Sequence, residues 1–230
     1  MTQAIHVNGV TKTFLRPLIP IRSLQDRLLH PHATEIMRID ALKDVTVTVQ
    51  KGEWIGCYGP NGSGKTTFLK TVAGLLRPSS GDVNVQGTMS PFFELGIGFH
   101  PEKQAYENIR LHGMLLGLRK HEIRDMTRRV LDFAGIGRHA ELPMKCYSTG
   151  MRLRLAFASS IEAKADIYLF DEIFAVGDAD FKKKCQRHFE DLKTAGKTVL
   201  IVSHDRERLQ ELCDRVLFFR EGTVSETDQT

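Results

Sequence analysis

A glycine-rich loop is the first part of this chain whose residue types could do chemistry. The run GPNGSGKT, at residues 59–66, lies between the apolar stretch WIGCY and the helix-like stretch TFLKTVAGLL. Glycines allow a tight turn in which successive backbone N–H groups point at phosphate oxygens, and the positive end of the following helix adds to the attraction. The strand, loop and helix context predicts a Walker A phosphate-binding loop rather than a glycine-rich turn with a chance lysine.

Two side chains of this loop have specific predicted roles. Lys65 should reach the β- and γ-phosphates of ATP, and Thr66 should place its hydroxyl on Mg²⁺. The other residues predicted for the ATP site in or beside the loop are Gly59, Asn61, Gly62, Ser63, Gly64 and Thr67.

Two adjacent carboxylates follow a second apolar run. Residues 167–170 predict a buried strand, and Asp171 and Glu172 come at its carboxyl end, which is the ligand edge of an open α/β sheet. Asp171 would hold Mg²⁺, directly or through water, and Glu172 would orient and deprotonate the attacking water. Adjacent acids after a strand are often only a solvated turn, but the apolar run and the upstream loop favour the catalytic interpretation.

A histidine, His204, follows a further apolar run at residues 199–202. A lone histidine at a strand end is usually structural. Because this one comes downstream of the paired carboxylates, we expect it to touch the γ-phosphate and to help polarise the attacking water.

The segment YSTGM, at residues 147–151, opens the helix-like stretch MRLRLAFASSIEA. A serine hydroxyl, free backbone N–H groups and a helix start can together face a phosphate. A simple nucleotide kinase lacks such a segment, which indicates a motor that closes around ATP as a dimer.

Taken together, these motifs resemble the nucleotide-binding subunit of an ABC transporter, over roughly residues 5–222. The family signature commonly reads LSGGQ and completes the ATP site of the opposite subunit. The resemblance implies that role for Ser148 and Gly150, which match the pattern, and for Thr149 and Met151, which depart from it. It also implies that Asp178, in AVGD, belongs to a D-loop that crosses the dimer interface.

Three segments resemble one subfamily more closely: the YSTGM signature, FELGIGFHPE at 93–102 and DEIFAVGDADFKKKC at 171–185. That subfamily exports lipid-linked polysaccharides such as capsule, O-antigen and teichoic-acid polymers. The resemblance implies a transport-coupled ATPase that uses ATP and Mg²⁺. It also implies a homodimer held at the cytoplasmic face of the inner membrane by a polytopic permease dimer, with only indirect contact with the lipid-linked glycan.

Two functional positions of the family, the Q-loop residue and the aromatic residue that stacks on adenine, can each be assigned in more than one way. The Q-loop normally offers a glutamine to Mg²⁺; Glu94 is the candidate, because a carboxylate can also bind Mg²⁺, and Gln104 is the alternative but comes late. Phe14 is the candidate for the aromatic ring that stacks on adenine, and its alternative role is a core residue.

Rival functions come from other classes. A soluble, non-transport ABC ATPase, such as a scaffold or assembly factor, is not excluded by the motifs, and only the subfamily resemblance argues against it. A chromosome or DNA-repair ATPase is disfavoured because no heptad run separates Lys65 from Asp171, and a ribosome-acting factor needs two such domains in one chain. The net charge of +4 is too small to indicate a nucleic-acid partner.

Length and composition predict one domain over residues 1–230. The 230 residues contain no apolar run of the roughly 18 to 20 needed to span a bilayer, and the four scattered cysteines show no metal-ligand spacing. The expected fold is an α/β P-loop NTPase with a RecA-like core, an antiparallel β subdomain and a helical subdomain at 104–161. We expect strands near 4–10, 43–49, 53–58, within 82–93, and near 166–170, 198–202 and 215–219, with helices near 64–75, 178–194 and 205–213.

An insertion at residues 15–40 separates the first two strands and contains SLQDRLL, which can form a short helix with Ser23 as its N-cap. One interpretation is a surface loop. The other, which the subfamily resemblance suggests, is a helix at the membrane surface where Arg16, Arg22 and Arg27 could meet a lipid pyrophosphate headgroup.

Overall fold

The structure, a computed structural model, describes residues 2–17, 36–93, 99–172 and 178–227. Its core is a six-stranded sheet in which five neighbouring strands are parallel and the edge strand β9 is antiparallel. The strand order is β5 (Met89–Phe92), β6 (Ile167–Asp171), β7 (Thr198–Val202), β3 (Trp54–Tyr58), β8 (Arg215–Arg220) and β9 (Thr223–Ser225). Every residue of β6 and β7 is buried, which explains their continuous apolar sequences.

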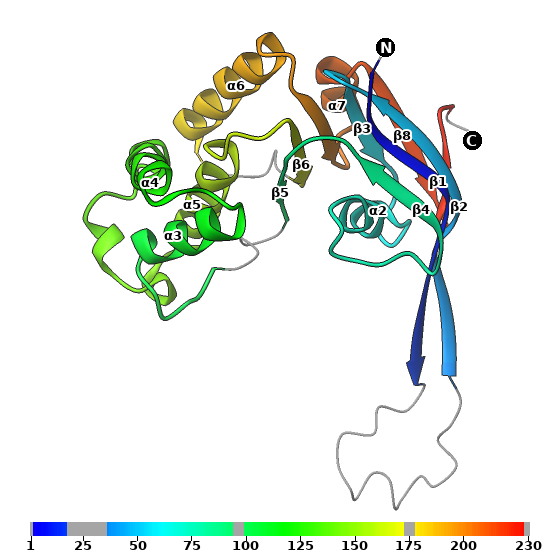
Figure 1. Ribbon diagram of the computed structural model, residues 1–230, viewed down its shortest axis with the longest axis horizontal. Helices are drawn as coiled ribbons and strands as arrows, with labels where there is room; N and C mark the ends of the chain where they lie inside the picture. The colour runs from blue at the N-terminus through cyan, green and yellow to red at the C-terminus, as the bar shows by residue number, and fades with distance from the viewer. Residues whose placement is uncertain (1, 18–35, 94–98, 173–177, 228–230) are drawn as a thin grey trace, which may run out of the picture.

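A second, antiparallel sheet has the order β2 (Ile36–Gln50), β1 (Gln3–Pro17) and β4 (Ser80–Val85). Its inward side chains, such as Val7 and Val45, share one apolar cluster with Phe68 of the helix α2 (Lys65–Val72) and Leu200 of β7. The phosphate-loop helix is therefore held between the two sheets, as Figure 1 shows.

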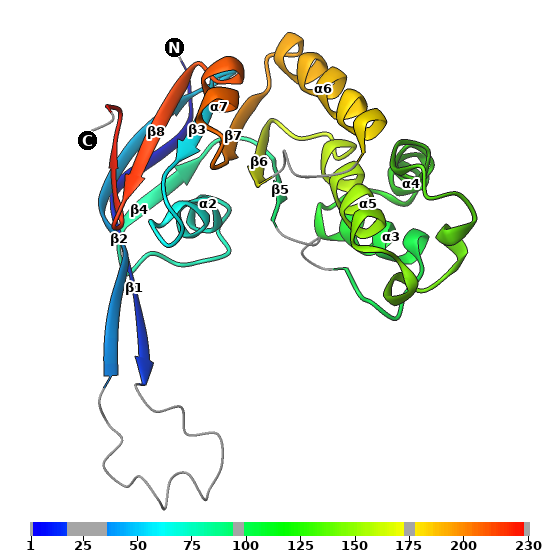
Figure 2. The same cartoon turned by 180° about the vertical axis from the view of Figure 1, so that it is seen from behind.

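The other face of the parallel sheet is covered by helices. Phe157 of α5 (Thr149–Ile161) and Phe189 of α6 (Ala179–Thr194) pack with Phe170 of β6 in a second apolar cluster. The helices α3 (Ala105–Leu115) and α4 (Lys120–Ala134) pack with α5 around a third cluster, and α7 (Arg206–Leu212) follows β7. Figures 1 and 2 show α3, α4 and α5 gathered on the far side of β5 and β6 from α2.

The structure agrees with the expected α/β architecture, adds the short edge strand β9 that was not expected, and differs from the sequence analysis in two further places. The region 82–93 contains two strands that belong to different sheets, β4 and β5. Residues 15–17 and 36–40, which the sequence analysis assigned to an insertion, instead continue β1 and β2 as a protruding hairpin, with Leu15 opposite Arg38 and Arg16 opposite Met37. Ile36 and Ile39 are β-branched residues that favour a strand, and the antiparallel ladder of β1 and β2 continues through both segments. The predicted short helix, with Arg22 and Arg27, lies outside the described residues.

Among the described residues, none of the helices is both long and apolar enough to span a bilayer.

Candidate functional site

The candidate site lies where β6, β7 and β3 end side by side. Asp171 is the last residue of β6, His204 comes shortly after β7, and the glycine-rich loop follows β3. The carboxyl ends of adjacent parallel strands form the usual ligand edge of such a sheet. A cavity of about 360 Å³ opens there. Its lining residues are Ala41, Asn61, Gly62, Gly64, Lys65, Thr66, Thr67, Asp171, Glu172 and His204.

Gly59 and Gly64 allow the loop to lie in close contact with the backbone of β8 and of β2. A Cβ on Gly59 would lie 2.2 Å from the carbonyl oxygen of Phe219, and one on Gly64 would lie 2.5 Å from that of Ala41. Both residues have positive φ, at 154° and 109°. These glycines therefore set the shape of the loop, which no L-residue with a side chain could adopt without moving β8 or β2.

Replacing Gly59 with alanine should lower the free energy of unfolding by about 2 to 3 kcal/mol, because the new methyl group would overlap the Phe219 carbonyl at a strained φ. Gly62→Ala is the matched control: its Cβ would meet no described atom within 4 Å, so only its φ of 79° opposes the substitution, at a cost of about 1 kcal/mol. Urea unfolding measures both values. Equal losses would show that the close approach to β8 does not matter.

Lys65 is pre-placed at the mouth of the loop. Its side chain is buried, and Nζ donates hydrogen bonds to the carbonyl oxygens of Gly59 (2.7 Å) and Pro60 (2.8 Å). Burial lowers the pKa of Lys65, and the neighbouring carboxylates of Glu172 and Asp171 oppose that shift. A phosphate in the cavity would offer the ammonium group a charged acceptor, which is stronger than two neutral carbonyls.

A pair of oxygen donors in the same cavity fits a magnesium ion. The hydroxyl of Thr66 comes from the first turn of α2, and the carboxylate of Asp171 comes from the end of β6. Mg²⁺ prefers hard oxygen ligands and usually takes only one or two from the protein, the rest being water and phosphate. These two residues could therefore hold the ion beside a bound nucleotide.

Glu172 and His204 face each other at the edge of the cavity. Nε2 of His204 lies 3.0 Å from Oε1 of Glu172, and the backbone N–H of Glu172 donates to the carbonyl of Val202 at 3.0 Å. Glu172 has a φ of 53°, an uncommon conformation for a residue with a side chain, and such outliers gather at functional sites. The histidine can orient the carboxylate, so that one of its oxygens faces the cavity.

The signature residues lie elsewhere in the same chain. Ser148 caps α5, its Oγ accepting from the backbone N–H of Met151 at 3.1 Å, and Ser148 and Thr149 are exposed. Gly150 is half-buried in the first turn. Figures 1 and 2 both place α5 apart from α2, so one chain does not bring its signature turn to its own phosphate loop.

Four of the ATP-site and interface candidates also do not line the cavity; one is Gly59, which instead lies against the backbone of β8. Asp178 caps α6, its Oδ1 accepting from the N–H of Phe181 at 3.0 Å. Ser63 is buried and does not line the cavity. Phe14 lies half-buried on β1, with the Lys12 ammonium 5.2 Å from its ring centroid, and it does not line the cavity either.

The two Q-loop candidates have different outcomes. Glu94 lies outside the described residues. The Gln104 side chain is engaged elsewhere: Nε2 donates to the carbonyl of Glu141 at 2.7 Å, at the start of α3. Ala41 also lines the cavity, from β2, and was not expected there, because an alanine in a strand carries no chemical signal in the sequence.

Comparisons with known proteins agree on one family. The model of the ABC transporter family matches residues 42–175. The ABC transporter protein AbcA of Aeromonas salmonicida is 39% identical over 218 residues, which is 95% of this chain and 70% of that protein. The O-antigen export system ATP-binding protein RfbB of Klebsiella pneumoniae is 38% identical over 207 residues, which is 88% of this chain and 84% of that protein.

A third relative and a solved structure extend the comparison. The teichoic acids export ATP-binding protein TagH of Listeria innocua is 35% identical over 199 residues, which is 86% of this chain and 59% of that protein. A bacterial ABC transporter cassette, solved as a dimer, superposes with a TM-score of 0.76 at 25% identity and covers 96% of each chain.

Proposed function

The chain belongs to the ABC transporter family, and from this premise we propose that it is the ATP-hydrolysing subunit of an exporter for a lipid-linked polysaccharide. The observation that carries the proposal is its identity of 38% and 35%, over 88% and 86% of its length, to ATP-binding proteins of O-antigen and teichoic acid export systems. We place the protein at the cytoplasmic face of the inner membrane, held there by a membrane permease, with the glycan contacted indirectly.

ATP hydrolysis follows from the groups that line the cavity. The loop N–H groups and Lys65 would bind the phosphates, and Thr66 and Asp171, which line the same cavity, would hold Mg²⁺. When bound, the ion would neutralise charge on the phosphate oxygens. Glu172 accepts a proton from the attacking water, while His204, 3.0 Å away, holds the carboxylate in position.

Two copies of the chain would form the complete ATP sites. The turn at residues 148–151, of which Ser148 and Thr149 are exposed, lies away from its own phosphate loop, and a similar cassette was solved as a dimer. In a head-to-tail pair, Ser148, Thr149, Gly150 and Met151 of one copy would face the γ-phosphate held by the other, with free N–H groups at the start of α5 as donors. ATP would then favour the closed pair, and this difference in affinity is what moves the permease.

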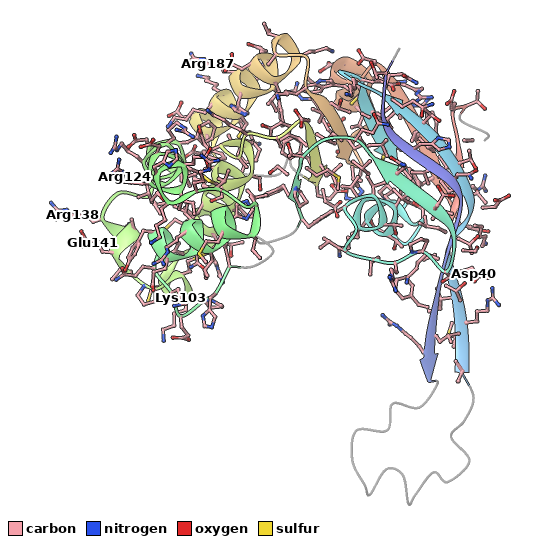
Figure 3. All side chains as sticks on the ribbon, viewed as in Figure 1. Asp40, Lys103, Arg124, Arg138, Glu141 and Arg187 are labelled. Carbon is pink, nitrogen blue, oxygen red and sulfur yellow. The ribbon has the colours of Figure 1, made fainter. Side chains whose placement is uncertain are left out.

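A cavity between α3 and α4 is the surface that we assign to the permease. It has a volume of about 480 Å³, and its lining residues are Tyr106, Arg110, Lys120, Ile123, Arg124 and Thr127. None of its three cationic side chains forms an ion pair with a carboxylate of the described residues, and Tyr106 is half exposed. Figure 3 shows Arg124 pointing outward from the helical part. An acidic helical segment of the permease would fit this charge.

Reversing two of these charges should weaken assembly with the permease by about tenfold or more, because like charges across an interface are repelled. The variant is Arg110→Glu with Arg124→Glu, and both side chains are exposed. Arg187→Glu, exposed on α6, is the matched control. Co-purification with the membrane fraction gives the measurement, and ATP turnover of the isolated protein should be unchanged. Equal recovery of the double variant and the control would exclude this surface.

The proposed function is tested by purifying tagged Glu172→Gln protein with ATP from its native host in mild detergent. Mass spectrometry then identifies the proteins and lipids that accompany it. A polytopic permease at equal stoichiometry, together with a lipid-linked glycan, is the expected result. Recovery of soluble partners alone would overturn the transport function and leave a non-transport ABC ATPase.

A further inference from the structure

One arginine beside the signature turn is half-buried and lacks an acceptor. Arg152 lies near the start of α5, where its backbone N–H donates to the carbonyl of Ser148 at 3.0 Å. The side-chain Nε of Arg152 is buried without a hydrogen-bond partner, and no ion pair within the described residues includes its guanidinium. A buried donor without an acceptor costs free energy and is rare, so this arginine is a candidate for contact with another molecule.

The next arginine on the same helix has a different environment. Nη2 of Arg154 lies 2.6 Å from Oδ2 of Asp178 at the start of α6, and its Cζ lies 5.3 Å from the ring centroid of Phe181. Two positions along an α-helix correspond to a rotation of about 200°, so Arg152 faces away from α6 where Arg154 faces toward it. Asp178 therefore neutralises Arg154 and not Arg152.

Arg152 shares a helix face with the serine that caps α5. Residues four apart lie on one face, about 6 Å apart along the axis, and helical side chains lean toward the N-terminus. The side chain of Arg152 can therefore extend to the signature turn, in which Ser148 and Thr149 are exposed. There it can present its donors beside the hydroxyl of Ser148.

The signature turn itself offers a phosphate no formal positive charge. Ser148 Oγ accepts from the N–H of Met151 at 3.1 Å, and the Met151 side chain packs against the third apolar cluster. The remaining donors are the hydroxyls of Ser148 and Thr149 and the first N–H groups of the helix, which have no partner within the helix. These groups are neutral, whereas a guanidinium matches phosphate oxygens in both charge and geometry.

We propose that Arg152 is a further catalytic residue, which contacts the terminal phosphate of the ATP held by the partner copy. The inference rests on the proposed function, in which the signature turn of one copy faces the phosphate loop of the other. When water attacks the γ-phosphorus, its proton passes to Glu172, and the bridging oxygen leaves on ADP with the electron pair of the broken bond. Arg152 neither gives nor takes a proton; it stabilises negative charge on the oxygens of the transferred phosphate.

Arg152→Gln should lower kcat by about tenfold to a hundredfold, because charge-assisted hydrogen bonds to the phosphate are lost. Binding of a fluorescent ATP analogue to a single copy should stay within about twofold, since Arg152 does not line its own cavity. The Tm should not fall, because the substitution removes a buried donor that has no acceptor. Arg152→Lys should recover part of the rate, since it keeps the charge but not the fork.

Dimer formation tests the contact between copies directly. In a Glu172→Gln background, which should retain ATP, adding Arg152→Gln should raise the ATP concentration needed for the dimer by about tenfold, as measured by size-exclusion chromatography. Arg128→Gln removes the same charge from an exposed position on α4 and is the matched control. It should leave kcat, analogue affinity and the dimer unchanged.

The outcomes separate the inference from the proposed function. A normal kcat in Arg152→Gln, or a loss of kcat with an equal loss of analogue affinity, would overturn the inference. A fall in Tm with unchanged dimer formation would also overturn it, because the arginine would then serve folding alone. In each case ATP turnover by the unmodified protein would still support the proposed function, whereas an unmodified protein that hydrolyses no ATP would overturn both.

Discussion

Glu172→Gln should reduce ATP turnover by about a hundred to ten-thousandfold and leave ATP binding intact. The amide is nearly isosteric with the carboxylate, so it can keep the contact with His204 at 3.0 Å, but it cannot accept the proton of the attacking water. Because hydrolysis would no longer reopen the pair, the variant should accumulate as an ATP-bound dimer. Steady-state phosphate release measures the rate, and size-exclusion chromatography with and without ATP measures the dimer.

A control makes this result specific to the site. Glu190→Gln removes the same charge from an exposed position on α6 and should turn over at the unmodified rate. Normal turnover by Glu172→Gln itself would transfer the general-base role to another group, and His204, which lines the same cavity, would be tested next.

Lys65→Ala should weaken ATP binding by about a hundredfold, with turnover falling accordingly. In the structure this ammonium group is buried at the mouth of the loop and bonded to the carbonyls of Gly59 and Pro60. A phosphate replaces those carbonyls with charged oxygens, so the alanine variant loses an interaction that is stronger with ligand than without it. Equilibrium binding of a fluorescent ATP analogue gives the affinity directly.

Lys70→Ala is the matched control, because it removes a lysine from the last turn of the same helix. Its affinity for the analogue should equal that of the unmodified protein. Thermal unfolding of both variants shows whether the fold survives, and a folded Lys65→Ala protein with normal affinity would contradict the assignment of this lysine to the phosphates.

The phosphate loop and the Ser148 cap could be predicted from the sequence because each depends only on residues close to it in the chain. The strand, the loop and the helix of the phosphate site follow one another directly in the chain: an apolar run comes before Gly59, the glycines come next, and a helical stretch follows. They could therefore be located without knowing which other segments they pack against. Ser148 is similar, since an N-cap bonds to a residue only three positions away. Family membership follows from the same motifs, and the comparisons confirm it.

The length of the hairpin formed by β1 and β2 could not be predicted from neighbouring residues alone. Residues 36–40 pair with 13–17, and whether two segments separated by a long connection continue a ladder depends on their register, not on either segment alone. The first strand was therefore expected to end near residue 10, whereas β1 continues to Pro17.

The sequence by itself determined which side chains could bind phosphate, hold a metal and activate water, because residue type and neighbouring backbone decide those capacities. Only the tertiary structure decided that they meet. Strands β6, β7 and β3 are distant in the chain but adjacent in the sheet, and this order brings Asp171, His204 and Lys65 to one cavity. The contact of Arg154 with Asp178 likewise depends on how α5 and α6 pack. These contacts form because strands and helices from the whole chain bury their apolar faces against one another. The sequence of one segment does not show which other segments it will pack against.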